Sequence, residues 1–449
     1  MALFLRIMLM AMMMMIAPAP SSSAASAADS TDETVTIVDL SQDLPEDAAA
    51  MASSPGAAAI HDVASNDPFI RAAVVLEKGS VVAQYIRDDD TNVVDPETPF
   101  HVWSTTKSWM SLLVGVLVDG NLLSIDETLG DIFADDSDAW ADVTDNETIP
   151  FRKAVTVEEM LTMSSGLISP LDEFPMIPGV ELTEEDFERD LGNWGGSSLS
   201  DSLALPDIGS KGNFSYLATS NILSYVVKER TDMTPRQYLA ENVMAHLGIA
   251  ESDYNWLQNG EGIEPAFHGL ELTPLQMAKF GQLYLQGGRS QPATNEDHHR
   301  LISQSWIDAS FTQHSVDSVT NLGYGYLFWK LGSAYCAFGM FGQDICIDQN
   351  LERVVVQQRD PDYVNYLQGS FIIAPVGLNP ALSFAAQSED TNNSYPSAAP
   401  SKFVSPTEDT NNSSSSAPSK VANSSPIGPI AAVASWLLGL STLLSLAIY

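Results

Sequence analysis

Basic residues are scarce in this chain of 449 amino acids. Lysine and arginine together number 20, against 58 aspartates and glutamates, and the formal net charge is −38 at pH 7. A surface with that charge repels the phosphate backbone of nucleic acids, so we expect no nucleic-acid partner. The charge suits a soluble domain in a salty or extracellular medium, but it carries no information about chemistry.

Cysteine and histidine are also rare. Two cysteines and seven scattered histidines offer no cluster with the spacing of metal ligands, so we expect no metal and no other cofactor. Cys336 and Cys346 are equidistant from Phe341, and a tight hairpin centred there would place them opposite each other. In a secreted chain this permits a cross-strand disulfide, and the alternative is two separate buried thiols.

Both ends of the chain carry apolar runs. Residues 1–27 have an arginine near the start, an apolar stretch and a small-residue cleavage site at Ala25-Ser26-Ala27, which predicts a secretory signal peptide rather than an uncleaved anchor. Residues 427–449 contain no charge and follow small residues at 423–425, which resembles a GPI-attachment signal. A C-terminal transmembrane helix is the alternative, and either would tether the protein to a membrane at the cell surface.

The segments next to these ends are polar and of low complexity. Residues 379–426 repeat "EDTNNSYPSAAPSK" as "EDTNNSSSSAPSK", which predicts a disordered stalk, and residues 28–66 are rich in Ala, Ser and Asp, which predicts a weakly ordered lead-in. Residues 67–378 remain as one folded domain, which we expect to be a monomer. Glycosylation sequons begin at Asn146, Asn213, Asn392, Asn411, Asn412 and Asn423.

The folded part opens with a hairpin signal and then a helix. In "RAAVVLEKGSVVAQYI" two β-branched runs flank Lys78-Gly79-Ser80, and from Ser104 to Val118 the apolar residues keep helical spacing. Ser104 therefore lies at or beside a helix N-cap, with Lys107 one turn later on the same face.

Ser104 and Lys107 form the chain's one Ser-x-x-Lys, which has two interpretations. In the first, Ser104 is a nucleophile and Lys107 its base, at a helix N-terminus that favours developing negative charge. Alternatively, they are a capping serine and an ordinary surface lysine. The neighbouring Trp103 and Trp109 indicate a helix wrapped in core, where a lysine needs a partner or a lowered pKa.

Residues 72–359 resemble the serine β-lactamase and penicillin-binding-protein-like superfamily, above all its esterase and 6-aminohexanoate-dimer-hydrolase branch. The segments that carry the resemblance occur in the family's order: "VWSTTKSWMSLLVGVLVDGNL", "VTVEEMLTMSSGL", "GNFSYLATSNILSYVV", "GLELTPLQMAKFGQLYLQGG", "LGYGYLFWK" and "AFGMFGQDICID". The resemblance implies an α+β fold of the β-lactamase/transpeptidase type, with an antiparallel sheet flanked by helices and an all-helical lobe.

The resemblance also assigns roles to residues. It makes Ser104 the nucleophile, Lys107 the group that deprotonates it, and Tyr216 the proton carrier to the leaving group. The backbone N–H groups of Ser104 and Gln343 match the oxyanion hole, with Gly342 beside them.

Three further positions bear on specificity. The family often has Tyr-x-Asn, but Ala218 stands in the third position here, so Asn221 substitutes for the asparagine or its function is missing. His268 falls near the rim, where it contacts substrate or, as we expect, has a structural role. Met340 stands where penicillin-recognising members carry a cation, followed by Phe341, and an apolar wall cannot pair with a carboxylate.

The sequence therefore predicts a secreted, surface-tethered serine hydrolase. Its substrate is expected to be an uncharged small-molecule ester or amide, with weak or absent β-lactamase activity. The competing hypothesis is a catalytically inactive surface binding protein that retains the fold.

Overall fold

The computed structural model describes residues 35–361, apart from 54–59, 61–63, 65–66, 68, 90–91, 169–197, 205–206, 217–219, 293–299 and 319. The predicted signal peptide, the stalk with its four sequons and the C-terminal apolar segment lie outside the described residues. Within the described ranges, no helix is both long and apolar enough to cross a membrane.

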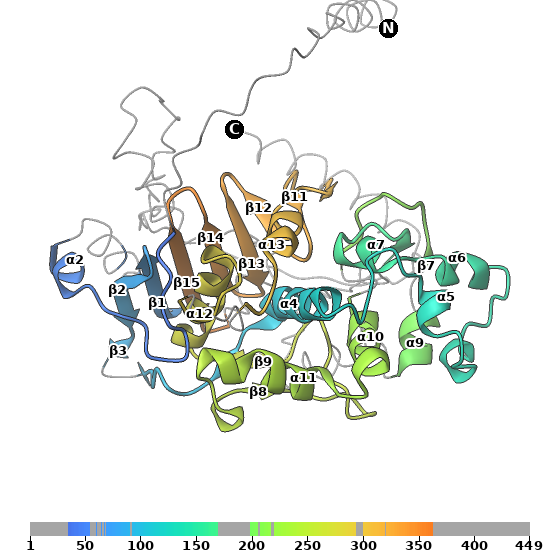
Figure 1. Cartoon of the computed structure of the whole chain (residues 1–449), viewed down its shortest axis with the longest axis horizontal. Helices are drawn as coiled ribbons and strands as arrows, with labels where there is room; N and C mark the ends of the chain where they lie inside the picture. The colour runs from blue at the N-terminus through green and yellow to red at the C-terminus, as the bar shows by residue number, and fades with distance from the viewer. Residues whose placement is uncertain are drawn as a thin grey trace, which may run out of the picture. The chain divides into compact units, whose positions relative to one another are not determined.

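The centre of the fold is an eight-stranded sheet with the order β10-β11-β12-β13-β14-β15-β1-β2, visible in Figure 1. Every neighbouring pair is antiparallel, as the fold class predicts. Its strands are β1 (Ile70–Glu77), β2 (Ser80–Ile86), β10 (Ser315–Val316), β11 (Gly323–Tyr324), β12 (Trp329–Leu331), β13 (Ala334–Gly339), β14 (Gln343–Asp348) and β15 (Arg353–Arg359).

Smaller sheets connect the other parts of the fold. Strand β5 pairs with β9, and β9 with β8, while β3 pairs with β4 and β6 with β7. These strands are β3 (Asp88–Asp89), β4 (Asn92–Val93), β5 (Phe100–His101), β6 (Leu167–Ile168), β7 (Asp207–Ile208), β8 (Asn255–Trp256) and β9 (Leu270–Leu272).

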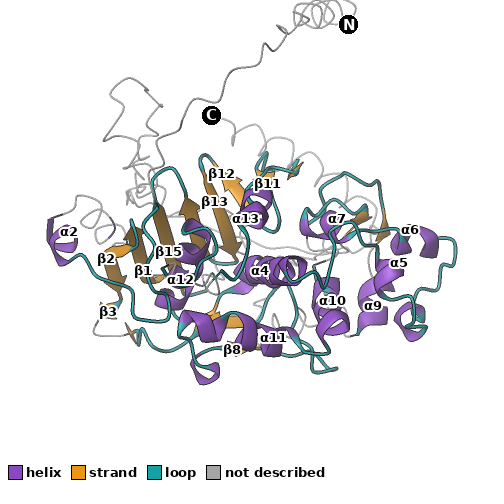
Figure 2. Ribbon diagram, in the orientation of Figure 1, coloured by secondary structure: helices purple, strands orange, loops and turns teal. Residues whose placement is uncertain are grey.

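Helices pack on the sheet and also form a separate lobe. Figure 2 shows the helical lobe beside the sheet, with α4 running between them, which agrees with the predicted architecture. The lobe contains α5 (Leu129–Ile132), η2 (Asp138–Trp140), α6 (Ile149–Lys153), α7 (Val157–Leu161), α9 (Leu199–Ala204) and α10 (Ile222–Thr231). The other helices are α2 (Ala48–Ser53), η1 (Trp103–Thr105), α4 (Thr106–Asp119), α11 (Pro235–Asn242), η4 (Met244–Leu247), η5 (Glu251–Asp253), α12 (Pro274–Leu285) and α13 (Gln304–Ser310).

Helix α12 shows how local signals and packing agree. Thr273 and Gln276 form a capping box, and the helix then buries almost every side chain. Gly281 faces the central strands so closely that a Cβ atom there would lie 2.3 Å from Val354 Cγ1. A larger residue would therefore force the helix away from the sheet.

The predicted hairpin between β1 and β2 is confirmed. Lys78 and Gly79 form its two-residue turn, with φ values of +49° and +80°. Positive φ at both central positions gives the turn a twist that matches the twist of the strands.

The segment "LGYGYLFWK" contains two strands, β11 and β12, because the chain turns at Leu327, whose φ is +61°. One other expectation differs from the structure. The lead-in predicted over 28–66 is packed where it is described: Leu40 is fully buried, and the Val38 backbone exchanges two hydrogen bonds of 3.1 Å with the Gln286 side chain. The few apolar side chains of this polar segment pack into the hydrophobic core and hold the segment in place.

Candidate active site

Ser104 lies in a tight turn between strand β5 and helix α4. The preceding residue, Trp103, has a φ of +50°, which is uncommon for a bulky side chain and marks stored backbone strain. The turn is held to the main sheet, because Thr105 Oγ1 donates to the Gln343 carbonyl at 2.5 Å. Ser104 is part of the 3-10 turn η1, one residue before the N-cap of α4, so the predicted helix start is nearly correct.

A glycine allows the sheet to approach this turn. A Cβ atom at Gly339, the last residue of β13, would lie 2.3 Å from the Val102 carbonyl oxygen. Strand β13 therefore ends in direct contact with the backbone that carries Ser104. This fixes the distance between the predicted nucleophile and the β13–β14 hairpin.

Lys107 faces Ser104 across one helical turn. Its Nζ lies 2.8 Å from Ser104 Oγ and donates to the Phe267 carbonyl at 3.2 Å. The side chain is 1% exposed, and none of the described carboxylates forms an ion pair with it. Burial lowers the pKa of Lys107 well below its usual 10.5, which favours a neutral amine able to accept a proton. The alternative of an ordinary surface lysine is therefore wrong.

Tyr216 lies against the Lys107 amine. Lys107 Nζ is 4.6 Å from the centre of the Tyr216 ring, and the Trp329 ring centre is 5.4 Å from it. The Tyr216 side chain is half-buried. Burial of its hydroxyl raises the pKa of Tyr216 to about 12. The phenol therefore keeps its proton at neutral pH. The three predicted catalytic residues thus come together.

Gln343 and Gly342 lie where the β13–β14 hairpin meets the Ser104 turn. The Gln343 side chain is engaged with strand β15, donating to the Arg359 carbonyl at 2.5 Å and accepting from its N–H at 3.2 Å. Gly342 has a φ of +92°, and its N–H closes the hairpin turn on the Gly339 carbonyl. The side chain of Gln343 is therefore structural, and the role of its N–H in an oxyanion hole stays a prediction.

Asn221 and His268 have different surroundings. Asn221 is buried at the start of α10 and donates to Ser202 Oγ at 3.0 Å, which joins α10 to α9, and a role towards substrate stays a prediction. His268 follows the Phe267 carbonyl that Lys107 contacts, and its Nε2 is buried without a hydrogen-bond partner among the described residues. Burial, with smaller effects of Lys107 and His101, lowers the pKa of His268 to about 3, so the ring is neutral.

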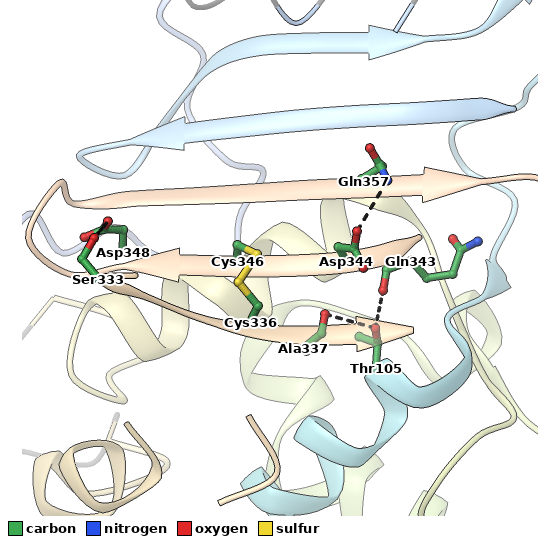
Figure 3. The surroundings of a disulfide bond; sticks show 9 residues. All are labelled: Thr105, Ser333, Cys336, Ala337, Gln343, Asp344, Cys346, Asp348 and Gln357. Atoms are coloured by element: carbon green, nitrogen blue, oxygen red, sulfur yellow. Dashed lines mark hydrogen bonds between the residues drawn. A yellow bond between two sulfur atoms is a disulfide. The ribbon is translucent and has the colours of Figure 1, made fainter. Parts of the chain in front are cut away.

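The cysteines form the predicted disulfide. Cys336 and Cys346 are directly opposite each other in β13 and β14, with Cα atoms 4.1 Å apart, in a hairpin whose turn contains Phe341. Figure 3 shows the bond bridging the two strands, with Gln343 and Asp344 at the start of β14, on the side of Thr105. The disulfide therefore clamps the hairpin that supports the Ser104 turn, and the alternative of separate thiols is wrong.

Sequence reasoning placed Phe341 in an apolar wall at the site, but it missed Asp344 and Trp329. Phe341 lies edge-on to Trp103, with ring centres 5.5 Å apart, so the turn of the hairpin forms an apolar rim beside Ser104. Asp344 is 2% exposed next to this turn, and burial raises its pKa to about 8. Trp329 contacts Tyr216 through its indole. No local pattern could have identified Asp344 and Trp329, because each acts through contacts with distant segments.

Comparisons with known proteins agree with this geometry. A model of the beta-lactamase family matches residues 48–363. No curated protein matches the chain. Among solved structures, a protein from Bacillus anthracis named as a 6-aminohexanoate-dimer hydrolase is similar at 16% identity, covering 72% of this chain and 81% of its own, with a TM-score of 0.51.

Two further solved structures are similar in fold. One is titled "EstCE1, a hydrolase with promiscuous acyltransferase activity", at 12% identity, 70% and 94% coverage and a TM-score of 0.52. The other is a crystal structure of SurE, at 16% identity, 74% and 75% coverage and a TM-score of 0.51. At these identities the similarity establishes the fold alone.

Proposed function

Because the chain belongs to the beta-lactamase family, whose members are generally serine hydrolases, we propose that it cleaves an uncharged ester or amide through an acyl-enzyme on Ser104. The observation that carries this proposal is the arrangement around Ser104 Oγ. Lys107 Nζ lies 2.8 Å away, buried and without a counter-charge among the described residues, and the centre of the Tyr216 ring lies 4.6 Å from that amine.

The first half-reaction forms the acyl-enzyme. Lys107, as a neutral amine, takes the Ser104 proton while Oγ attacks the carbonyl carbon, which gives a tetrahedral oxyanion. The N-terminal turn of α4 favours the developing negative charge at this position. When the bond to the leaving group breaks, Tyr216 donates its phenol proton to that group, and the proton held by Lys107 replaces it.

The second half-reaction releases the acid. Water attacks the acyl carbon and gives up one proton to the Lys107 and Tyr216 pair, while the bond to Ser104 Oγ breaks and that oxygen is reprotonated. The products are a carboxylic acid and the free enzyme. No cofactor is needed for this balance, because hydrolysis transfers no electrons.

The apolar rim supports an uncharged substrate. Met340 and Phe341 lie in the turn of the hairpin, and Phe341 packs against Trp103 beside the proposed nucleophile. Neither side chain can neutralise a carboxylate, which a penicillin would bring to this edge of the site. We therefore expect short neutral esters to be better substrates than penicillins. Rapid turnover of nitrocefin would contradict this specificity.

Labelling of Ser104 tests the proposal. The purified protein should react with a fluorophosphonate probe and hydrolyse p-nitrophenyl esters, and Ser104→Ala should abolish both. Ser108→Ala is the matched control, because Ser108 lies one turn further along α4 and donates to the Leu327 carbonyl instead of facing the site. The proposal fails if Ser104→Ala is labelled as strongly as wild type, or if the folded protein hydrolyses no acyl substrate.

The contacts also bear on the competing hypothesis of a binding protein that lost catalysis. Such a protein has no need to bury a lysine 2.8 Å from the Ser104 hydroxyl with the Tyr216 ring against it. This arrangement favours the hydrolase. A folded, inert wild-type protein would revive the binding hypothesis.

A further inference from the structure

One glycosylation sequon falls in a segment that the fold holds in place. Asn213 begins the sequon "NFS", in the stretch between β7 and α10. The backbone on either side of this asparagine is anchored to the turn that follows α7. The Gly212 N–H donates to the Ser164 carbonyl at 2.8 Å. The Ser215 N–H donates to the Met163 carbonyl, also at 2.8 Å. A group attached to Asn213 would therefore have a fixed base on the helical lobe.

The amide of Asn213 is accessible. The residue is exposed, and its side chain makes no hydrogen bond to the described residues. It lies in a turn that Gly212 permits, with a φ of +85°, and its own N–H donates to the Ser210 carbonyl at 3.2 Å. An exposed asparagine in a surface turn suits an N-linked glycan, because the oligosaccharide is bulky and hydrophilic.

The sequon lies at the edge of the candidate site. Asn213 precedes Tyr216 by three residues, so their Cα atoms are at most about 11 Å apart. The ring centre of Phe214, between them, lies 6.3 Å from that of Tyr216 and 5.6 Å from that of Trp329 in β12. Lys107 Nζ is in turn 4.6 Å from the centre of the Tyr216 ring. The exposed asparagine is thus tied to the junction of the lobe and the main sheet, beside the proposed catalytic residues.

We propose that Asn213 carries an N-linked glycan in the secreted protein, and that this glycan covers the edge of the Ser104 site and restricts it to small acyl substrates. The inference rests on the proposed function and on the secretory signal expected in residues 1–27. It adds a size limit, set by the modification, to the preference for uncharged substrates that the apolar rim supports.

Such a glycan acts through its size and its fixed base. A branched oligosaccharide extends further than the span between Asn213 and Tyr216, and its hydrophilic surface gains nothing from packing on the apolar rim. It therefore moves in the solvent at the edge of the site, where it obstructs a long or polymeric acyl group more than a short one. Because it touches no reacting atom, it affects the entry of substrate and not the chemical step.

The modification needs a donor that the secretory pathway supplies. The donor class is an oligosaccharide linked to a lipid through pyrophosphate. The Asn213 amide nitrogen bonds to the anomeric carbon of the first sugar and loses one proton. The bond from that carbon to the phosphate oxygen breaks, and the lipid pyrophosphate leaves with the electron pair. Nothing is oxidised or reduced in this transfer.

Occupancy of the sequon is measured on the full chain, expressed in a eukaryotic host and recovered from its medium or membranes. Release of the glycans by a peptide N-glycosidase in heavy-oxygen water converts each glycosylated asparagine to a labelled aspartate, which mass spectrometry of the peptides locates. We expect the label at position 213. Recovery of Asn213 as unlabelled asparagine overturns the inference, whether or not Asn146 is labelled, and so does a chain that never enters the secretory pathway.

Two matched variants test the size limit. Asn213→Gln removes one acceptor, and Asn146→Gln removes the other exposed acceptor of the folded part, ahead of α6 at the outer end of the lobe in Figure 1. Asn213→Gln should raise kcat/KM for a p-nitrophenyl ester of a long-chain acid several-fold and leave kcat for p-nitrophenyl acetate within about twofold of wild type. Asn146→Gln should change neither. An unchanged preference for the short ester in Asn213→Gln overturns the size limit.

Trimming the glycan makes the test independent of folding. An endoglycosidase applied to the folded Asn146→Gln protein leaves a single sugar on Asn213, and it should raise kcat/KM for the long-chain ester as Asn213→Gln does. If trimming changes nothing, the glycan does not limit the site and the inference is overturned. If neither the intact nor the trimmed protein hydrolyses any ester, the proposed function fails, while the mass spectrum still decides whether Asn213 is modified.

Discussion

Helices α4 and α12 each bury a lysine in the core, but they differ in how they begin and in what the lysine faces. Helix α12 starts with a regular capping box, and Lys279 Nζ donates to the Leu247 carbonyl at 2.8 Å, near the charges of Asp39 and Asp43. Helix α4 starts without a side-chain cap, and Lys107 faces the Ser104 hydroxyl.

The difference between the two helices shows which departures from regular local structure indicate function. Burial lowers the pKa of both lysines, but at Lys279 two aspartates partly oppose the effect, whereas at Lys107 no charge of the described residues compensates it. The strained φ of Trp103 lies beside Lys107, while α12 follows the ordinary rules of helix formation. Departures from local rules concentrate at sites where geometry serves chemistry.

Removing each lysine in turn is the strongest test of this comparison. Lys107→Ala should lower kcat/KM for a p-nitrophenyl ester about a thousandfold, because the proton acceptor for Ser104 is lost. Lys279→Ala should change it less than threefold, since that amine only satisfies a carbonyl. Equal losses would mean that both lysines act through folding, which circular dichroism of each variant would detect.

The pH dependence should separate the two lysines further. A lysine whose folded pKa is depressed costs stability below its unfolded value of about 10.5, and the cost vanishes as pH rises through that value. Lys107→Met should therefore raise the free energy of unfolding at pH 7 but not at pH 11. The gain should be smaller for Lys279→Met, where Asp39 and Asp43 already favour the charged form.

The same lowered pKa predicts the activity profile. For wild type, kcat/KM should rise with pH as Lys107 loses its proton and should reach its plateau well below pH 10.5. Urea titrations and initial rates measured across the pH range check both effects. A rising limb centred at an ordinary lysine pKa would contradict the desolvated site.

Substitution of the N-cap residues of α12 and α4 is the test with the smallest expected effect. Thr273→Ala should lower the free energy of unfolding by about 1 kcal/mol through loss of the cap, with unchanged kcat/KM. Thr105→Val removes the hydrogen bond to Gln343 that holds the Ser104 turn to the hairpin, so it should also lower kcat/KM several-fold. If Thr105→Val affects only stability, the turn does not depend on this hydrogen bond.

Much of the fold was accessible from local pattern. The hairpin at Lys78-Gly79, the helix that follows Ser104 and the pairing of Cys336 with Cys346 depend on near neighbours in the chain, and the structure confirms them. The packed segment around Leu40 was missed, because its order comes from contact with α12 and not from its own composition.

The candidate site likewise has one part that local pattern predicts and another that depends on contacts between distant segments. The sequence by itself determined that Ser104 and Lys107 lie on one side of a helical turn, since three residues nearly complete a turn. Only the tertiary structure decided the rest: the burial that makes Lys107 a base, the approach of Tyr216, and the indole of Trp329 behind it. Burial and long-range hydrogen bonds arise where distant segments meet, so no local pattern encodes them.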